Sequence, residues 1–379
     1  MDAEWRCTVD SSCMNRAGGL FCAHVPMASF LPSPETCEKL AQISPRFGGS
    51  MKVMPGDSEV VYSLPVHASG EIRDFLRPFT SVKIAPGFLT RLPGGRVFGS
   101  GNVLSPDGRS IARDVSPDFG KSFSDHWLLT FRKIRPPVAL EGAVAVIATT
   151  LGAGYSHWLL EELPRLLLLA PNSVSTIIAH GVSAFSREAL RLHGFSGRVI
   201  EPGRGTHFAC EQLVIPGLPG EPGQPTSCVS RLLSEFTVPL HAPSSDFGER
   251  LYVSRGKARR RRVSNEDALW PQLESRGFTR VYLEDLTWKE QINAFRHAKV
   301  IAAPHGAGLA NLVFCGPETR VVEFFHRAYV NPCFWRLAAL QGLDYRPVVD
   351  ALSGPLACDV RSGRLDIEAP VETILNAIN

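Results

Sequence analysis

From Gly142 onward, the chain alternates between short apolar runs and longer segments in which apolar residues recur with a helical period. Apolar runs bounded by Gly, Pro or Ser are typical of buried strands, and the helical period is typical of amphipathic helices. The pattern predicts strands at 142–150, 174–180, 198–202 and 211–217, and helices at 156–170, 183–194 and 228–240. Strands that alternate with helices indicate a parallel sheet with helices on its faces.

The same alternation returns after a polar stretch with Pro and Ser at 241–249, which we interpret as an interdomain linker. Strands are predicted at 250–255, 278–284, 299–304, 319–325 and 344–350, and helices at 264–277, 287–298, 309–315 and 331–342. Thr287 and Glu290 have the spacing of a capping box, and Ser264 or Asn265 is expected to cap its helix. Two consecutive doubly wound α/β domains with a cleft between them explain this pattern.

The predicted domain organisation has four parts. An N-terminal extension at 1–30 is interpreted as disordered, and the rest of the region before Arg135 is rich in Pro, Gly and Ser and predicts only short strands and turns. One α/β domain is expected at 31–240 and the second at 248–350. The remaining segment, 351–379, is expected to pack back on the N-terminal domain.

Composition narrows the class of protein. The 379 residues are 44% hydrophobic and 20% charged, which is enough apolar material for two cores. With 40 basic and 37 acidic residues the net charge is +3, which gives no reason to expect nucleic acid as a partner. Nine cysteines without a Cys-x-x-Cys pair predict free thiols in a reducing compartment, and neither a disulfide framework nor a zinc site.

The sequence also bears on localisation. No uncharged apolar run approaches the ~20 residues that span a bilayer. The first thirty residues lack a basic region followed by an unbroken apolar run, as a secretion signal would have. We expect a cytoplasmic protein, and peripheral contact with the inner face of the membrane stays open.

Small residues gather in "PHGAGLANL", which follows the predicted strand at 299–304. Gly306, Ala307 and Gly308 come directly after His305 and before a helix. Backbone N–H groups at a helix start favour an anion, and ligands of open α/β sheets collect at this edge, so a phosphate could reach the backbone here. A tight turn that merely needs glycine explains the loop alone equally well. The loop is neither a Walker loop nor a dinucleotide fingerprint.

A basic run, "SRGKARRRR", occupies 254–262. A solvated charged surface is the common interpretation of such a run. A nucleic-acid patch is disfavoured because no aromatic residues interleave. Arg255 directly follows a predicted strand, so it shares the sheet edge with the glycine loop, and this favours guanidinium groups that neutralise a pyrophosphate.

Three further residues are candidates because of where they lie. Glu323 stands among apolar strand residues, where its carboxylate needs either an ion-pair partner in the core or a ribose diol at the sheet edge. His157 and Glu161 are four residues apart on one predicted helix face, the spacing of a general base and the group that orients it. A cap or packing role for His157 is the alternative.

Four collinear motifs resemble glycosyltransferase family 61: "HWLLEELPRLLLL", "YVSRGKARRRRVSNEDAL", "FRHAKVIAAPHGAGLANLVFC" and "VVEFF". The resemblance covers about Gly142 to Asp350 and is to the bacterial capsular or cell-surface polysaccharide type. It implies a GT-B fold of two Rossmann-like domains, with the acceptor mainly in the first and the donor nucleotide in the second. It also implies inverting transfer from a UDP-sugar to a glycan or lipid-linked glycan.

By motif, the resemblance assigns catalysis to His157 and Glu161, although Asp is commoner in the family at the second position. It assigns donor binding to Arg255, Arg259, Arg262, His305, Gly306, Ala307, Gly308, Asn311 and Glu323. No Asp-x-Asp occurs in the sequence, so we expect no metal and no cofactor beyond the UDP-sugar co-substrate. A catalytically silent nucleotide- or sugar-binding module and a nucleotide-sugar epimerase are the alternatives. The sequence does not indicate the oligomeric state.

Overall fold

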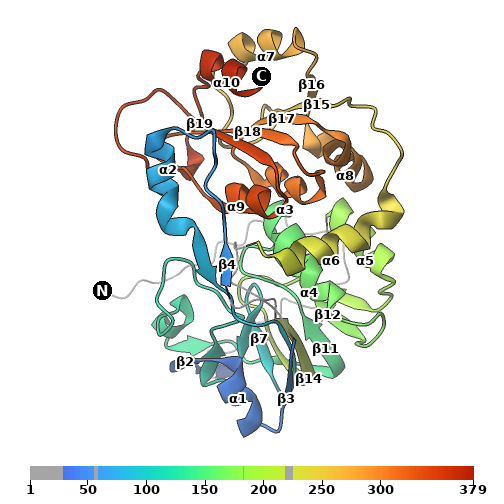
Figure 1. Cartoon of the computed structure of the whole chain (residues 1–379). Coiled ribbons are helices and arrows are strands. Elements are labelled where there is room, and N and C mark those ends of the chain that lie inside the picture. Colours follow the sequence, from blue (N-terminus) through green and yellow to red (C-terminus); the bar gives the residue numbers. More distant parts are fainter. Residues whose placement is uncertain (1–28, 55–58, 182, 218–224) are drawn as a thin grey trace, which may run out of the picture.

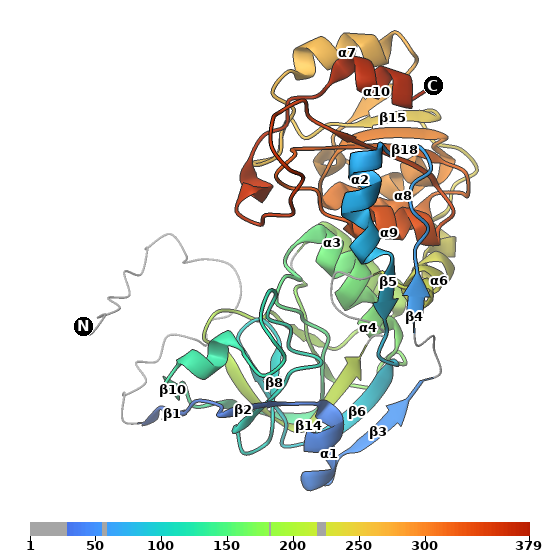
Figure 2. The ribbon, with the colours of Figure 1, turned by 60° about the vertical axis from the view of Figure 1, so that its left-hand side comes forward.

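The computed structural model describes residues 29–54, 59–181, 183–217 and 225–379 (Figure 1). Nearly all of the predicted extension at 1–30 lies outside the described residues. The two large β-sheets, one in each half of the chain, are separated by a layer of helices (Figures 1 and 2). Two further sheets are small: β1 (Leu31–Pro32) pairs with β10 (Lys133–Ile134), and β4 (Glu59–Val61) pairs with β5 (Ser81–Lys83). We call residues 29–240 the N-terminal half and residues 250–379 the C-terminal half.

The C-terminal half contains a five-stranded sheet in the order β16-β15-β17-β18-β19, and every neighbouring pair is parallel. The chain therefore winds outward in both directions from β15, and the switch point lies between β15 and β17. The strands are β15 (Arg250–Val253), β16 (Thr279–Val281), β17 (Val300–Pro304), β18 (Arg320–Phe325) and β19 (Asp344–Val349).

Helices cover both faces of this sheet because successive strand residues point to opposite sides. Tyr252 and Val322 belong to the core under α7 and α10, whereas their neighbours Leu251 and Val321 belong to the core under α8, η8 and α9. These elements are α7 (Glu266–Glu274), α8 (Trp288–His297), the 3₁₀ helix η8 (Ala307–Phe314), α9 (Cys333–Leu340) and α10 (Val371–Ala377). The C-terminal half is thus the doubly wound, Rossmann-like domain that the sequence predicts.

The N-terminal half has a mixed sheet of ten strands. The predicted parallel part is present as β13-β12-β11-β14. Beyond β14 the sheet continues with β6 and β7, both antiparallel to β14, and then with short strands of the first 112 residues. Only the parallel part of this half therefore matches the predicted doubly wound domain, because hairpins of the N-terminal region supply the rest.

The described strands of the N-terminal half are short on its N-terminal side and longer where the parallel part begins. They are β1 (Leu31–Pro32), β2 (Thr36–Glu38), β3 (Ser50–Val53), β6 (Phe88–Pro93), β7 (Arg96–Phe98), β8 (Asn102–Leu104), β9 (Ser110–Ala112), β10 (Lys133–Ile134), β11 (Val138–Val146), β12 (Thr176–Ile178), β13 (Arg198–Ile200) and β14 (His207–Gly217). One helix, α1 (Leu40–Arg46), covers the face of this sheet that points away from the C-terminal half (Figure 1).

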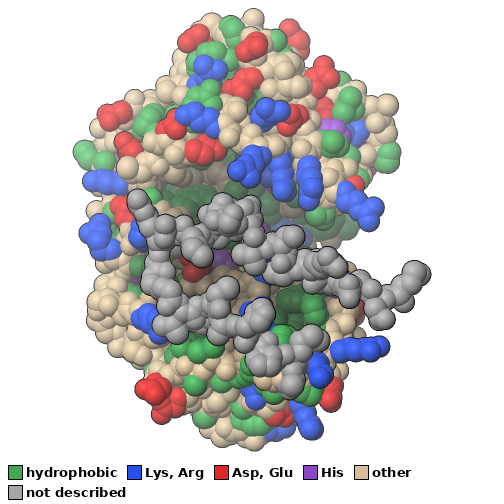
Figure 3. Space-filling view, turned by 180° about the vertical axis from the view of Figure 1, so that it is seen from behind, with side chains coloured by type: hydrophobic (Ala, Val, Ile, Leu, Met, Phe, Trp, Pro, Cys, Tyr) green, Lys and Arg blue, Asp and Glu red, His purple; other side chains and the backbone are tan. Residues whose placement is uncertain are grey.

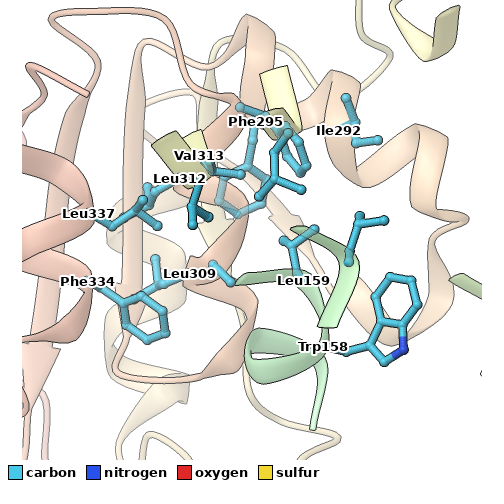
Figure 4. Packing of buried hydrophobic residues seen from close by; sticks show 14 of the residues in the cluster. Trp158, Leu159, Ile292, Phe295, Leu309, Leu312, Val313, Phe334 and Leu337 are labelled. Carbon is cyan, nitrogen blue, oxygen red and sulfur yellow. The ribbon is translucent and has the colours of Figure 1, made fainter. Parts of the chain in front are cut away.

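The helices between the two sheets share one hydrophobic core. From the N-terminal half come α3 (Tyr155–His157), the π-helix η5 (Trp158–Glu162), α4 (Leu163–Leu167), α5 (Ala184–His193) and α6 (Ser227–Thr237). Trp158 and Leu159 of η5 belong to one cluster with Ile292 of α8 and Leu309 of η8, shown in Figure 4. The two halves are therefore packed against each other rather than joined by the linker alone.

A segment of the N-terminal half crosses to the C-terminal half (Figure 2). This segment, residues 59–83, is called the arm; it contains β4 (Glu59–Val61), α2 (Gly70–Leu76), η3 (Arg77–Phe79) and β5 (Ser81–Lys83). The indole Nε1 of Trp335 in α9 donates to the Ser63 carbonyl at 3.0 Å, and Arg336 Nη2 donates to the Phe79 carbonyl at 2.9 Å. The predicted domain at 31–240 therefore contacts the C-terminal half through the arm.

The last segment packs mainly on the C-terminal sheet. Ile367, Ile374 and Ile378 are buried with Tyr252 in the core under α7, so this part of the segment closes the outer face of that sheet. Of the predicted N-terminal domain, the arm lies beside α10, since His67 and Asn376 line one shallow cavity. The apolar side of α10 is buried against α7 and the strands of the C-terminal sheet.

Two general features concern only the part of the chain that the structure describes. No helix there combines the length and the apolar character needed to cross a bilayer. The cysteines of that part are free thiols: Cys37, Cys210, Cys228, Cys315, Cys333 and Cys358. Cys7, Cys13 and Cys22 lie outside the described residues.

Candidate functional site

A cavity of about 400 Å³ lies between the two halves, at the carboxyl edge of the C-terminal sheet. The segments that follow β15, β16 and β17 form most of its wall, so it sits at the switch point where open α/β sheets bind ligands. The N-terminal half contributes Tyr155, Phe185 and Glu188. In the view from behind, Lys and Arg side chains gather along the C-terminal side of a hollow between the halves (Figure 3).

The glycine loop forms one wall of this cavity, and close packing explains its glycines. Gly306 has an extended backbone with φ 178°, which any residue adopts. A Cβ there would lie 2.2 Å from Nη1 of Arg255, and a Cβ on Gly308 would lie 2.5 Å from Cδ1 of Leu283. The loop is therefore not a turn that needs positive φ. Its glycines make room for Arg255 and Leu283.

Arg255 is the cation in the described lining of the cavity. Its Nε and Nη2 donate to the Arg260 carbonyl at 3.2 and 2.9 Å, which fixes the guanidinium beside Gly306. Burial lowers the pKa of Arg255 to about 10, and the positive charge of Arg261 adds to this effect. Arg255 is still a cation at neutral pH. Together with the N–H groups at the start of η8, it forms a place for an anion.

The other arginines of the basic run do not line the cavity. Arg261 has a left-handed backbone with φ 54°, and its Nε donates to the His305 carbonyl at 3.0 Å. Arg262 forms an exposed ion pair with Asp366 at 3.1 Å, and Arg259 is exposed. Arg259 and Arg262 lie outside the described cavity lining, and their contact with the donor stays a prediction. Arg261 thus stabilises the glycine loop through the His305 carbonyl, outside the cavity lining.

Glu323 lies in the core rather than on the cavity wall. Its Oε1 accepts from Nδ1 of His305 at 2.6 Å and its Oε2 accepts from the Tyr345 hydroxyl at 2.6 Å. Glu323 is fully buried and His305 is 4% exposed, so neither can reach a ribose in the cavity. Burial lowers the pKa of His305, although the carboxylate of Glu323 opposes this. The ion-pair alternative for Glu323 is correct, and the ribose contact expected from its position is not present.

Asn311 is likewise fully buried. Its Oδ1 accepts from the Tyr155 hydroxyl at 2.5 Å, and its Nδ2 donates to Oε1 of Gln291 at 3.1 Å. The residue expected to bind the donor thus joins the two halves of the chain. Tyr155 and Gln291, on either side of it, do line the cavity.

His157 and Glu161 form the pair that their spacing predicts. Nδ1 of His157 lies 2.7 Å from Oε1 of Glu161, and the two side chains are 27% and 7% exposed. A carboxylate only accepts, so Nδ1 carries the proton and Nε2 is left as the acceptor. The ring of Phe119 lies 6.2 Å from the His157 ring. The pair lies outside the lining of the cavity; His157 shares the turn of α3 with Tyr155, and Glu161 follows in η5.

The backbone at this pair is a π-helix, which the sequence pattern does not distinguish from an α-helix. It spans Trp158–Glu162, and Pro164 lies just inside the α-helix that follows. Pro164 has no N–H to donate to the preceding turn, so the hydrogen-bond ladder changes there. Single π turns of this kind occur frequently at functional sites.

Glu162, next to the predicted pair, was not singled out by the sequence. Its carboxylate is fully buried and accepts from the Thr149 amide at 2.8 Å and from Nδ1 of His180 at 2.6 Å. A Cβ on Gly152 would lie 1.5 Å from Glu162 Oε1, so this glycine makes room for the carboxylate. Glu162 thus ties the π-helix to the ends of β11 and β12. Its position within an apolar run was the available signal.

The cavity also contains polar residues that the sequence reasoning missed. Ser254 and Glu284 line it from the C-terminal half and Glu188 from the N-terminal half. Glu284 is the last residue of the predicted strand at 278–284, so the sequence could have predicted its position at the sheet edge. Among the residues that the structure describes, no group of three His, Cys, Asp or Glu side chains is arranged to hold a metal ion.

Residues 155–322 match the family model described as Glycosyltransferase 61. This stretch begins at Tyr155 and ends in β18, so it contains the His157–Glu161 pair, Arg255 and the glycine loop. The match therefore covers the segments that build the cavity and the pair beside it.

Shorter stretches are similar to glycosyltransferases of eukaryotes. Identity is 35% over 63 residues with a beta-1,2-xylosyltransferase of Oryza sativa subsp. japonica, covering 17% of this chain and 12% of that protein. It is 29% over 102 residues with a beta-1,2-xylosyltransferase of Arabidopsis thaliana, covering 24% and 19%. It is 31% over 118 residues with an EGF domain-specific O-linked N-acetylglucosamine transferase of Drosophila melanogaster, covering 30% and 22%.

The chain thus spans between 12% and 22% of the length of these relatives. Similarity of this extent bears on the shared domain and not on the substrates of the whole proteins. The matches support a glycosyltransferase 61 domain at residues 155–322 of this chain.

Proposed function

We propose that this chain is an inverting glycosyltransferase that moves a sugar from a UDP-sugar to a hydroxyl group of a glycan or lipid-linked glycan. One observation carries the proposal. A cavity at the switch point of a Rossmann-like sheet has a fixed guanidinium in its wall and is lined by Tyr155, which shares the turn of α3 with His157 of the His157–Glu161 pair. The family match and the homologous stretches support glycosyl transfer.

The donor would bind with its diphosphate against Arg255 and the N–H groups of Gly306, Ala307 and Gly308. A guanidinium and a helix start together favour a doubly charged group at this position. The apolar wall around Leu283 and Trp288 suits the less polar faces of the base and ribose. We interpret the arrangement of two sheets with the donor site between them as GT-B-like.

In the transfer step, Nε2 of His157 takes the proton of the acceptor hydroxyl while that oxygen attacks the anomeric carbon of the donor sugar. The bond from the anomeric carbon to the diphosphate oxygen breaks, and its electron pair leaves with UDP. Attack from the face opposite the leaving group inverts the configuration. Glu161 holds the ring in the required tautomer and stabilises the imidazolium that forms. Arg255 stabilises the charge that grows on the diphosphate.

We also propose that the reaction needs no divalent metal. Arg255 and the loop amides supply positive charge where metal-dependent sites use an ion. Activity is therefore expected to survive EDTA. Loss of activity in EDTA and its recovery with Mn²⁺ would show that the phosphate site has been misassigned.

The biological setting is inferred from the motifs alone. Their resemblance to bacterial capsule and surface-polysaccharide enzymes is the reason to place this protein in polysaccharide synthesis, in the cytoplasm and beside the membrane. The alternatives are a silent nucleotide- or sugar-binding module and a nucleotide-sugar epimerase. The intact, solvent-accessible His157–Glu161 pair favours an active transferase over the silent module.

A thermal-shift panel of nucleotides and nucleotide-sugars tests the donor first. A ligand at about 100 times its dissociation constant stabilises the fold by ~2.7 kcal/mol. A shift with adenine or guanine nucleotides but not with uridine nucleotides would contradict the UDP donor. Product analysis then separates the remaining cases: binding without turnover indicates the silent module, and an epimerised sugar nucleotide formed without an acceptor indicates the epimerase.

A further inference from the structure

Three side chains form a hydrogen-bonded chain across the boundary between the two halves. The hydroxyl of Tyr155 donates to Oδ1 of Asn311 at 2.5 Å, and Nδ2 of Asn311 donates to Oε1 of Gln291 at 3.1 Å. Nε2 of Gln291 then donates to the carbonyls of Leu283 and Leu286, at 2.9 and 3.3 Å. We call Tyr155, Asn311 and Gln291 the relay.

The relay has only one consistent orientation. The carbonyls of Leu283 and Leu286 can only accept, so Gln291 must direct its NH₂ group toward them and its oxygen toward Asn311. Asn311 must then direct its NH₂ group toward Gln291 and its oxygen toward Tyr155. The phenol must donate, and burial raises its pKa, which keeps it protonated. Reversal of any one amide would leave a buried donor or acceptor without a partner.

Each end of the relay lies at a part of the proposed active site. Tyr155 shares the single turn of α3 with His157, and the Trp158 amide closes that turn on the Gly154 carbonyl at 2.9 Å. Leu283 and Leu286 belong to the cavity wall, and Asn311 lies in η8, which begins at the glycine loop. Trp158 and Leu159, which follow Tyr155 in the sequence, and Leu309, which precedes Asn311, belong to one packed core (Figure 4).

We propose that the relay positions His157 with respect to the donor cavity, so that Tyr155, Asn311 and Gln291 act on turnover through His157. The inference rests on the proposed function. The relay holds the turn of α3 at a fixed distance from the wall formed by residues 283–287. Without the Tyr155 hydroxyl, the buried Oδ1 of Asn311 loses its donor, and the α3 turn is free to shift away from η8.

A double-mutant cycle tests this coupling. Tyr155→Phe removes one oxygen atom and is expected to lower turnover by roughly 10- to 100-fold, the scale of a small misplacement of a reacting group. In a His157→Ala background the same change should cost less than about twofold, since the group it positions is gone. Asn311→Leu, at a fully buried position outside the cavity lining, should behave in the same way. Equal losses in both backgrounds would overturn the proposal.

Tyr62 provides a matched control. Its hydroxyl is also buried and donates to the Pro225 carbonyl at 2.8 Å, but it contacts no member of the relay. Tyr62→Phe should lower stability to a similar degree as Tyr155→Phe and leave turnover within about twofold of the wild type. If Tyr62→Phe lowers turnover as much as Tyr155→Phe does, the effect is a general loss of stability and the relay has no positioning role.

Hydrogen exchange in the ligand-free protein separates this proposal from the proposed function. Tyr155→Phe should speed amide exchange at both ends of the relay, at 155–162 and at 283–287, and leave the strand at 300–304 unchanged. Exchange that changes at 155–162 alone would show that the relay does not connect the two sites. If the wild-type protein turns over no nucleotide-sugar, the proposed glycosyltransferase function is refuted. The hydrogen-exchange result would still show whether the relay connects residues 155–162 with residues 283–287.

Discussion

Three buried glutamates each accept from Nδ1 of a histidine: Glu161 from His157, Glu162 from His180 and Glu323 from His305. The distances are nearly equal, at 2.7, 2.6 and 2.6 Å, so hydrogen-bond geometry does not distinguish the pairs. Exposure does, because the histidine side chains are 27%, 10% and 5% exposed. At the residue scale, His157 is thus the histidine of these pairs that an acceptor hydroxyl reaches most readily.

His157→Ala is expected to lower turnover by roughly 100-fold or more, the usual effect of losing a general base. UDP affinity, measured by calorimetry, should stay unchanged because the residue lies outside the cavity lining. Replacement of the exposed His67 by Ala serves as the control and should have no effect on turnover. A Glu161→Gln enzyme that is more impaired than His157→Ala would instead make the carboxylate the base.

Arg255 and Gly306 should give related phenotypes, because a Cβ at residue 306 would occupy the place of the guanidinium. Arg255→Ala is expected to cost about 3 kcal/mol of transition-state stabilisation, as for other donors to a developing anion, measured as the ratio of kcat/KM values. Gly306→Ala should lose a large part of the same amount. Arg259→Ala, at an exposed arginine of the same run, is the control, and a comparable loss there would contradict the special place of Arg255.

At the scale of the elements, the sequence predicts the strands of the parallel regions and the helices that connect them, because hydrophobic period and length are local properties. It does not predict α10, which covers one face of the C-terminal sheet. The capping box of Thr287 and Glu290 is present at the start of α8, as predicted. Asn265 takes the N-cap position of α7, but its side chain binds the backbone of Ala369 instead of its own helix. That exchange depends on a partner 104 residues away, which no local pattern contains.

Because local patterns do not contain long-range contacts, only some of the site residues could be placed from the sequence. Arg255, the glycine loop and the His157–Glu161 pair were predictable because strand ends and helical spacing place them. Glu323 and Asn311 carry side chains suited to a ligand, yet both are satisfied inside the protein by Tyr345, His305, Tyr155 and Gln291. Whether a polar side chain faces a cavity or a buried partner is decided by tertiary packing.

Thr287→Ala should lower the free energy of unfolding by ~1 kcal/mol, the usual cost of losing an N-cap side chain. The reason is that the Glu290 amide loses the Thr287 hydroxyl as its acceptor, now at 3.2 Å. Urea denaturation measures the change. Thr287→Ser keeps the hydroxyl and should restore most of the stability; no difference between the Ala and Ser variants would show that the cap contributes little.

At the scale of the whole molecule, the two halves share a core, and the arm of the N-terminal half packs on the C-terminal half. The two halves are therefore expected to unfold together. The central cluster contains Tyr62 of the arm, Leu159 of the N-terminal half and Phe295 of the C-terminal half. Calorimetry should show one transition with equal calorimetric and van't Hoff enthalpies. Two separate transitions would mean that the shared core contributes little to the stability of either half.

Stability of the whole protein should also depend on pH through buried histidines. Burial lowers the pKa of His126 and His207 to about 4, from an ordinary value of 6.5. The unfolded chain therefore binds protons that the folded protein does not, and stability should fall as pH decreases from about 6.5 to about 4. Urea midpoints across this range measure the loss. His207→Gln should reduce the slope, and an unchanged slope in this variant would show that His207 does not cause the loss.

The arm has a consequence for how a ligand enters. Within the described residues, the arm contacts the C-terminal half through its Ser63 and Phe79 carbonyls, and the chain passes between the halves again at the linker 241–249. The hydrogen bonds from Trp335 and Arg336 to the arm oppose the wide hinge motion that the linker alone would allow. Exchange of substrate and product would then depend on local movement of the loops at the cavity mouth, with the two halves remaining docked throughout the cycle.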